Sequence, residues 1–578
     1  METVSYVLNN ATAKIAASFV LSCWTGSVLW ANGVEMRLID APTSVYERVA
    51  GTEMPEGCPF EKSRVFAGVG FTKRHAEYTG ADTWYPSWAK DGKLYSPWTD
   101  GTVNGVRCSS AGDHAATGHA TILGDDPLHL RVVQEGTFKS SPRPYASRYP
   151  CGSLVVDGVW YYGTYCLHPR GTVERDGINY DWPWLGPFVG FRWSTDFGKS
   201  WHETPCTPAN PLFGEQALQG ESVRLAVPHF VDFGCEMQHS PDGKAYLVVQ
   251  GSSDGVNRRY GYNSWITSDQ AFLIRVKPSI ENMNKASEYE FFAGHDTSGK
   301  PLWTRDMKQM KPLLEWRDHM GRVSMTYNPA LRKYFMCVTD GRTTAANFTT
   351  YLLEADEMTG PWRLAAYLPD FGPQGYFVNI PSKFISSDGT TMWLCYSANY
   401  RKDYRQIKRT FPSHSGYAMC LREFKLLKAD EAAGLLSQAT ARNLANEAQV
   451  TASSVFNGYS VEGLRDGVVG GYPGDITTEW ASKYESTTAM VRLDWDSPRT
   501  VARIQLFDRP TELAQMTGGL LVFSDGTTIR VGALPDDARK GLEIRFPPKR
   551  VKWLLLAIDA VKPGTTNVGI SEMAVFAR

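Results

Sequence analysis

Two acidic residues lie in settings where a carboxyl group could carry out acid–base chemistry. Asp82 stands in the segment GADTWY, and Glu236 stands in the segment GCEMQH. Hydrolysis of a glycosidic bond needs two carboxyl groups: one protonates the leaving oxygen, and the other attacks carbon or activates water. We therefore predict that Asp82 and Glu236 form such a pair, with Asp232 as the alternative to Glu236. Asp100 and Asp340 each precede a glycine and are predicted to be turn residues.

A second group of residues suits a different reaction. His114 and His119 lie in a segment rich in Gly and Ala, and Tyr180 and Arg192 flank the aromatic sequence YDWPW. A uronate lyase needs a cation to neutralise the sugar carboxylate and a tyrosine or histidine to remove the C5 proton. A polysaccharide lyase is therefore an alternative function.

Aromatic residues make up 12% of the chain, and their flat apolar faces can stack on sugar rings. Several stand in loops or at the starts of predicted strands, together with polar residues that could bond a sugar. A packing role in the core is the alternative for each aromatic side chain. Besides His114, His119 and Tyr180, the residues predicted to contact a carbohydrate substrate are Trp84, Tyr85, Trp88, Trp182, Trp184, Arg192, His239, Arg317, His319, Tyr376 and Asn379.

The elements that must position these residues belong to a repeat. An apolar run, a turn of the Asp-Gly type and a strand of alternating large residues recur at 84–101, 151–165, 235–251, 323–341 and 379–399. Asp-Gly between alternating runs is a strong hairpin signal, because the turn needs positive φ. Each copy is followed by further strand-like sequence. The repeat predicts an all-β fold that begins with a five-bladed β-propeller, with residues 65–73 supplying the strand that closes the ring.

Four regions follow along the chain. Residues 1–33 contain an apolar stretch, 15–31, that is short for a membrane span and resembles a secretory signal. We expect no integral membrane span and a secreted, periplasmic or cell-surface protein. Residues 34–428 form the predicted propeller, the Ala-rich residues 429–442 a helical linker, and residues 443–578 a second domain.

The second domain resembles the discoidin, or coagulation-factor type C, modules. The matching segments, in characteristic order, are 443–445, 450–454, 464–467, 478–482, 491–494, 504–506 and 570–576. The resemblance implies a jelly-roll β-sandwich of the galactose-binding type that binds carbohydrate. It also implies an accessory sugar site that includes Trp480 and Arg509, and a structural calcium ion near Asp466.

The propeller is similar, more loosely, to the five-bladed propellers of family 43 glycoside hydrolases, and SxDxGxxW at 194–201 matches the Asp-box of sialidase-like propellers. The family 43 layout implies that Asp82 is the base and Glu236 the acid. The second-blade aspartate of that family has no counterpart here, because Arg148 and Tyr149 occupy its place. Propeller-type ulvan lyases, which have more blades, share the general plan and His, Tyr and Arg residues of this kind.

Composition excludes other classes. Lys and Arg number 60 against 61 Asp and Glu, a balance that argues against a general nucleic-acid binder. Phosphate-binding loops, nucleophile elbows and zinc motifs are absent from the sequence, so we expect no catalytic cofactor or metal. The sequence predicts a secreted glycoside hydrolase; the alternatives are a uronate lyase and a non-catalytic glycan-binding lectin.

Overall fold

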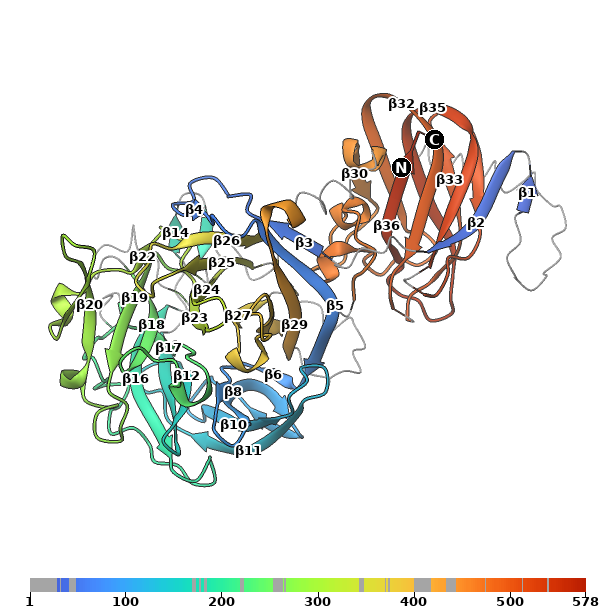
Figure 1. Cartoon of the computed structure of the whole chain (residues 1–578). Coiled ribbons are helices and arrows are strands. Elements are labelled where there is room, and N and C mark those ends of the chain that lie inside the picture. Colours follow the sequence, from blue (N-terminus) through green and yellow to red (C-terminus); the bar gives the residue numbers. More distant parts are fainter. Residues whose placement is uncertain are drawn as a thin grey trace.

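A computed structural model describes residues 29–31, 33–40, 48–168, 173–175, 178–180, 184–218, 223–252, 264, 267–341, 348–369, 371–372, 375–399, 417–432, 443–472, 475–511, 513–537 and 540–577. The fold is all-β, as predicted: five sheets surround a central axis, and a β-sandwich stands beside the fifth (Figure 1). Among the described residues, no helix is both long enough and apolar enough to cross a membrane.

Each blade of the propeller is one antiparallel sheet, apart from one short parallel pair. Blade 1 contains β6 (Gly80–Asp82), β7 (Ser87–Trp88), β8 (Leu94–Val103), β9 (Val106–Cys108), β10 (Ala116–Leu123) and β11 (Arg131–Lys139). Blade 2 contains β12 (Ser147–Val156), β13 (Val159–Leu167) and β16 (Leu185–Ser194), and β14 (Val173–Arg175) pairs with β15 (Ile178–Tyr180) in a separate ribbon. Blade 3 contains β17 (Val227–Phe230), β18 (Ala245–Gly251), β19 (Gln270–Val276), β20 (Glu290–His295), β21 (Pro301–Thr304) and β22 (Leu314–Glu315).

The last two blades both recruit strands from the N-terminal part of the chain. Blade 4 contains β23 (Arg322–Asn328), β24 (Lys333–Asp340), β25 (Thr349–Ala355), β26 (Arg363–Leu368) and, parallel to β26, β4 (Glu61–Lys62). Blade 5 contains β27 (Tyr376–Asn379), β28 (Thr391–Asn399), β29 (Tyr417–Leu427), β5 (Gly68–Tyr78) and β3 (Arg48–Gly51). Because β5 pairs with β29, the prediction that residues 65–73 close the ring is confirmed.

The predicted hairpin turns and the Asp-box have the expected local structure. Asp157 and Gly158 both have positive φ, 51° and 75°, in the two-residue turn between β12 and β13. In the Asp-box, the carboxylate of Asp196 accepts a bond of 2.9 Å from the backbone N–H of Ser200, and the Trp201 ring packs 4.8 Å from that of Trp160. The Asp-box therefore stabilises blade 2.

The sandwich holds its own apolar core. Its strands are β30 (Gln449–Ala452), β31 (Trp480–Ala481), β32 (Met490–Asp508), β33 (Met516–Phe523), β34 (Thr528–Val531), β35 (Lys540–Val561) and β36 (Gly569–Phe576). Residues 429–432 begin the expected helical connection, and 433–442 lie outside the described residues.

An N-terminal strand belongs to the sandwich and not to the propeller, which corrects the boundary predicted at residue 34. β2 (Val34–Asp40) pairs antiparallel with β35 and carries β1 (Leu29–Ala31) on its other side (Figure 1). The physical reason is a buried acid: the carboxylate of Glu543 in β35 accepts a bond of 2.8 Å from Nε of Arg37.

A buried ion pair joins the propeller to the sandwich. The guanidinium of Arg422, in β29, lies 3.3 Å from the carboxylate of Asp475, which precedes β31. Both side chains are at most 1% exposed. All nine described cysteines carry free thiols.

Candidate functional site

The carboxylate of Asp82 lies at the centre of the propeller, where the inner strand of blade 1 begins. The Asp82 side chain is 4% exposed. Its Oδ2 accepts a bond of 2.7 Å from Oη of Tyr376 in blade 5, and its Oδ1 accepts one of 2.6 Å from Oγ1 of Thr83. Thr83 has a φ of 71°, and its backbone N–H donates to Oγ of Ser397 at 3.0 Å. The carboxylate is therefore fixed at the seam between blades 5 and 1.

A buried guanidinium enters the same centre from blade 4. Arg322 begins β23, is 3% exposed, and donates from Nη1 to Oε1 of Gln250 and from Nη2 to Oη of Tyr165, both at 2.8 Å. Its charged carbon lies 5.0 Å from the centre of the Tyr165 ring and 5.3 Å from that of Phe377. Blades 2, 3, 4 and 5 thus meet at this one side chain. We call Asp82, Tyr85, Tyr165, Gln250, Arg322 and Tyr376 the hub.

Tyr85 stands in the hub with its hydroxyl group inside the protein. It is 7% exposed, and within the described residues its Oη has no hydrogen-bond partner. Its ring lies 4.3 Å from that of His229 in blade 3. Burial raises the pKa of Tyr85 well above its usual value, and burial and the charge of Arg322 hold the pKa of His229 well below. Both side chains are therefore neutral near pH 7.

A second carboxylate lies close to Asp82 in the sheet. Asp82 pairs with Thr99 of β8, and Asp100 is the next residue. The Asp100 carboxylate accepts bonds from N–H and Oγ of Ser110 at 2.8 and 2.7 Å. Burial raises the pKa of Tyr149, and the charge of Asp100 raises it further. Asp100 therefore lies in strand β8 beside the hub, and the prediction that it is a turn residue is wrong.

A cavity of about 50 Å³ continues along the axis below the hub, lined by residues of all five blades. This volume holds roughly three to five water molecules, so a sugar ring can enter the hub only when the surrounding side chains move apart. Asn379 lines the cavity, and its amide donates to the carbonyl oxygen of Trp84 at 3.1 Å.

Glu236 lies far from Asp82. It sits in a short 3-10 turn, η1 (Cys235–Met237), with a φ of 46°, and accepts a bond of 3.4 Å from the N–H of Lys90. Lys90, the partner of Glu236, follows soon after Trp88, which pairs with Leu94 of β8. Leu94 is five residues along β8 from Thr99, which pairs with Asp82. At about 3.4 Å per residue, the strand covers roughly 17 Å between these points, beyond the separation of about 5–10 Å that glycosidase carboxylates need. The structure does not bring Asp82 and Glu236 together.

The reason for this separation is the position of the inner strand in blade 3. β17 is Val227–Phe230, so Glu236 follows the strand, whereas Asp82 is at the beginning of its blade. The alternative, Asp232, accepts bonds of 2.6 and 2.8 Å from Oγ and N–H of Ser382. Asp232 therefore ties blade 3 to blade 5, and burial raises its pKa.

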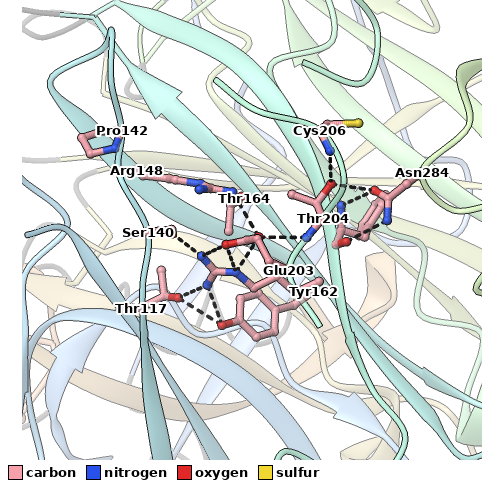
Figure 2. Close-up of polar contacts among 12 residues, drawn as sticks. Thr117, Ser140, Pro142, Arg148, Tyr162, Thr164, Glu203, Thr204, Cys206 and Asn284 are labelled. Carbon is pink, nitrogen blue, oxygen red and sulfur yellow. Dashed lines mark hydrogen bonds and ion pairs between the residues drawn. The ribbon is translucent and has the colours of Figure 1, made fainter. Parts of the chain in front are cut away.

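Arg192 belongs to a closed polar network in blade 2. It is fully buried; Nε donates to Glu203 at 3.1 Å and Nη1 to Oη of Tyr162 at 2.9 Å. Glu203 also pairs with Arg148 at 3.3 Å, so its carboxylate binds both guanidinium groups; Figure 2 shows Glu203 and Arg148 among the polar contacts of this network. The arrangement fixes Arg192 and Arg148 to protein groups, so a sugar contact is not the role that the structure gives Arg192.

The histidines of the predicted lyase group do not meet. His119 is 3% exposed and accepts a bond of 3.0 Å from Nε1 of Trp201. Burial, with the nearby charge of Arg192, lowers the pKa of His119 to about 4. His114 is exposed in a surface loop. The side chain of Tyr180 and the whole of Trp182 lie outside the described residues.

The other predicted aromatic contacts mainly pack. Trp84 is 1% exposed, donates from Nε1 to the carbonyl of Ala81 at 2.9 Å and stacks on Trp98. Trp88 packs half-buried against the same core. The ring of Trp184 lies 5.9 Å from that of His168, tilted by 31°.

His239 and His319 lie outside the hub. His239 contacts Gln238 at 3.1 Å, near η1. His319 places Nδ1 2.7 Å from Oδ2 of Asp340, with its ring 4.0 Å from that of Trp316. The exposed Arg317 is two residues away. Asp340 was predicted to be a turn residue and is instead a buried partner that orients His319.

The predicted accessory sugar residues lie inside the sandwich. Trp480 is fully buried and donates from Nε1 to the carbonyl of Ser454 at 2.8 Å. Arg509 is 5% exposed and pairs with Glu479 at 3.0 Å. Neither side chain stands on an exposed face, because each completes a buried hydrogen bond or ion pair.

Some of the groups around Asp466 are of the kind that bind a cation. The buried carboxylate of Glu572 accepts a bond of 3.1 Å from the N–H of Gly467, and Asn443 is 3.4 Å away. Two acidic side chains and nearby carbonyl oxygens are ligands that calcium prefers. Within the described ranges, no group of three or more His, Cys, Asp and Glu side chains is placed to hold a metal, so carbonyl oxygens would have to complete the shell.

These features define a five-bladed propeller with a polar centre, joined to a β-sandwich. Residues 443–576 match a family described as a domain of unknown function, DUF7402. The sandwich is similar to chitosan-binding module 1 of a chitosanase/glucanase from Paenibacillus sp. IK-5, at 22% identity and TM-score 0.18 over 23% of this chain and 98% of that one.

Two further solved structures are similar over a comparable share of the chain. The family 32 carbohydrate-binding module of NanJ from C. perfringens, in complex with galactose, has 15% identity and TM-score 0.19, over 23% of this chain and 94% of that one. The lectin domain of lectinolysin, in complex with Lewis B antigen, has 18% identity and TM-score 0.20, over 24% and 98%. No relative was found among the curated proteins.

Proposed function

We propose that this protein is a secreted enzyme that hydrolyses a polysaccharide or oligosaccharide in the hub of its propeller. The observation that carries the proposal is the state of Asp82: a buried carboxylate whose two oxygens are bonded to the hydroxyl groups of Tyr376 and Thr83. A carboxylate fixed in this way can act on a bound sugar without reorganisation of solvent at the moment of reaction. The apolar segment 15–31 supports secretion.

We assign the second carboxyl group to Asp100, in place of Glu236. Asp100 is the extra residue of a β-bulge, because Ala81 pairs with Gly101 and Asp82 with Thr99. Burial raises the pKa of Tyr376, and the charges of Asp82 and Asp100 both raise it further, which places the two carboxylates near the same hydroxyl group. Carboxyl groups of glycosidases are separated by about 5–5.5 Å in retaining enzymes and about 6.5–9.5 Å in inverting ones. In this scheme one of the two aspartates protonates the leaving oxygen, and the other attacks the anomeric carbon or activates water.

Release of reducing ends from a panel of plant, algal and microbial glycans tests the proposal. The wild-type protein should act on at least one glycan, and Asp82→Asn should lose at least about 100-fold of that turnover. Asp157→Asn, in an exposed hairpin turn, is the matched control and should retain it. Binding without turnover on every glycan would favour the lectin alternative and reject the hydrolase.

The sandwich is proposed to hold the enzyme on its glycan and to be stabilised by calcium. Asp466, Glu572 and nearby carbonyl oxygens would hold the ion, which would offset the charge of a carboxylate buried in the sandwich. The calcium ion would have no part in the reaction at the hub.

A uronate lyase is the second candidate, and Tyr85 favours it. Its buried hydroxyl makes no hydrogen bond to the described residues and lies on a ring that contacts the neutral His229. A tyrosine or histidine so placed can exchange a proton with a bound sugar. Absorbance at ultraviolet wavelengths from an unsaturated uronate product would establish the lyase, and its absence while reducing ends appear would establish the hydrolase.

A further inference from the structure

Arg322 differs from every other buried arginine of the described chain. Five arginines are at most 5% exposed, and four of them lie within 4 Å of a carboxylate. These four are Arg148, Arg192, Arg422 and Arg509. Arg322, the fifth, makes no ion pair with any described residue; its bonded partners are the neutral Gln250 and Tyr165.

A buried guanidinium without a counter-ion is unfavourable. A charge taken out of water loses its hydration, and neutral acceptors replace only part of that loss. The other four buried arginines show how this protein normally compensates, by an acid within the fold. The exception lies in the hub, where a ligand is proposed to bind, so the missing negative charge is one that a ligand can supply.

The atoms left without partners identify the side from which a ligand can bind. Nη1 and Nη2 of Arg322 already donate to Gln250 and Tyr165, whereas Nε is buried and has no hydrogen-bond partner in the described structure. The Tyr85 hydroxyl is a second buried group without such a partner. Both belong to the hub: the pKa of Tyr85 is affected by the charges of Arg322 and Asp82. An acceptor between them would satisfy two donors at once.

We infer that Arg322 binds the carboxylate of an acidic sugar, so that the substrate is a uronic-acid-containing glycan. The inference rests on the proposal that the hub holds a glycan, and holds for either mode of cleavage. A planar carboxylate matches the edge of a guanidinium formed by Nε and one Nη, and carries the single negative charge needed. Asp82 and Tyr376 would then face the remainder of the same sugar.

Equilibrium binding by calorimetry tests the inference on the full-length protein. The probes are trisaccharides of galacturonate, glucuronate and mannuronate, each beside its neutral methyl ester, and a sulfated galactose trisaccharide. Asp82→Asn is used as the background so that turnover does not consume the probe. At least one uronate should bind at least tenfold more tightly than its ester. Arg322→Gln should abolish that preference, a loss of about 10- to 100-fold in affinity for the acid.

Two further variants keep the result interpretable. Because Arg322 also bonds Gln250 and Tyr165, Arg322→Lys is included: it keeps the positive charge, removes the planar edge, and should retain part of the preference. Arg131→Gln removes an exposed arginine from the outer strand of blade 1 and should change nothing.

The inference is overturned if no uronate binds, if the esters bind as tightly as the acids, or if the preference survives Arg322→Gln. Binding of the sulfated trisaccharide alone would also overturn it. A uronate preference that depends on Arg322, in a protein without turnover, would support the inference and reject the proposed hydrolysis.

Discussion

The hydroxyl of Tyr376 donates to the carboxylate of Asp82 at 2.7 Å, across the seam where the last blade of the propeller meets the first. The two residues are 294 positions apart in the chain. They meet because β5 completes blade 5 and brings the start of blade 1 beside it. The closure of the ring therefore also assembles the proposed site. Burial, and then the charge of Asp82, raise the pKa of Tyr376 well above its usual value, so its hydroxyl remains a donor.

Substitutions at Asp100 and Glu236 distinguish the two candidates for the second carboxyl group of the proposed site. Asp100→Asn should reduce the turnover of the active glycan by at least about 100-fold, because Asp100 adjoins the strand position opposite Asp82. Glu236→Gln should leave it within about twofold, because Glu236 bonds the backbone of Lys90 at the far end of blade 1. Steady-state kinetics measure both. The reverse pattern would restore the sequence-based pair and reject the assignment of Asp100.

The pH dependence of stability should report on Glu543. Its side chain is 1% exposed. Burial opposes its charge, but bonds from Gln505, Arg545, Arg503 and Arg37 prevail and lower its pKa to about 2, from 4.5. A depressed carboxyl pKa stabilises the fold above the unfolded value, so this contribution, roughly 3 kcal/mol, should be lost as pH falls from 4.5 toward 2.

Urea unfolding of the full-length protein between pH 5 and pH 3 measures this effect. The sandwich of Glu543→Gln should be less stable at pH 5, and its stability should fall less than that of the wild-type protein with decreasing pH. Asp496→Asn, on an exposed stretch of β32, should follow the wild-type curve. Parallel curves for Glu543→Gln and wild type would contradict the role of Glu543 in holding β2.

The pair Arg422 and Asp475 should make the two domains unfold together. Removing one partner leaves an uncompensated buried charge, which typically destabilises by about 3–5 kcal/mol. The wild-type protein should therefore unfold in a single calorimetric transition. Asp475→Asn should lower the melting temperature of one domain, so that two separate transitions appear. The variant Asp494→Asn, whose pair with Arg492 is half-exposed, is the control and should keep the wild-type profile. An unchanged profile for Asp475→Asn would show that the pair does not couple the domains.

Calcium should stabilise the sandwich if Asp466 and Glu572 hold the ion. Addition of calcium to chelator-treated protein should raise the melting temperature of the sandwich by several degrees, and Glu572→Gln should abolish the increase. Magnesium should be less effective, since it requires a tighter octahedral shell. Equal melting temperatures with and without calcium would reject the proposed calcium site at Asp466 and Glu572.

The sequence predicted the blades well, because the signals are local. The turn at Asp157 and Gly158 needs positive φ, which that residue pair adopts readily, and the alternating runs beside it pair in register. The sequence did not predict β2 as part of the sandwich. Its pairing with β35 joins residues about 500 positions apart, and the ion pairs of Arg37 with Glu543 and of Asp40 with Lys540 stabilise it.

The site was harder to predict than the fold for the same reason. Asp82, Tyr85 and Tyr376 were identified because each stands near the start of an inner strand. Arg322 was not, since its partners Gln250 and Tyr165 are 72 and 157 positions away and no local pattern links them. The repeat in the sequence begins at Cys235, which predicts that Glu236 stands at the start of its blade. The inner strand lies earlier, at Val227–Phe230.

The most direct test of the central claim is a crystal structure of the Asp82→Asn variant soaked with the glycan that the wild-type protein cleaves. The account predicts a sugar ring in the hub, within hydrogen-bonding distance of residue 82 and Tyr85, with its carboxylate on Arg322. Sugar bound only to the sandwich, or beside His319 and Trp316, with the hub holding water alone, would contradict it.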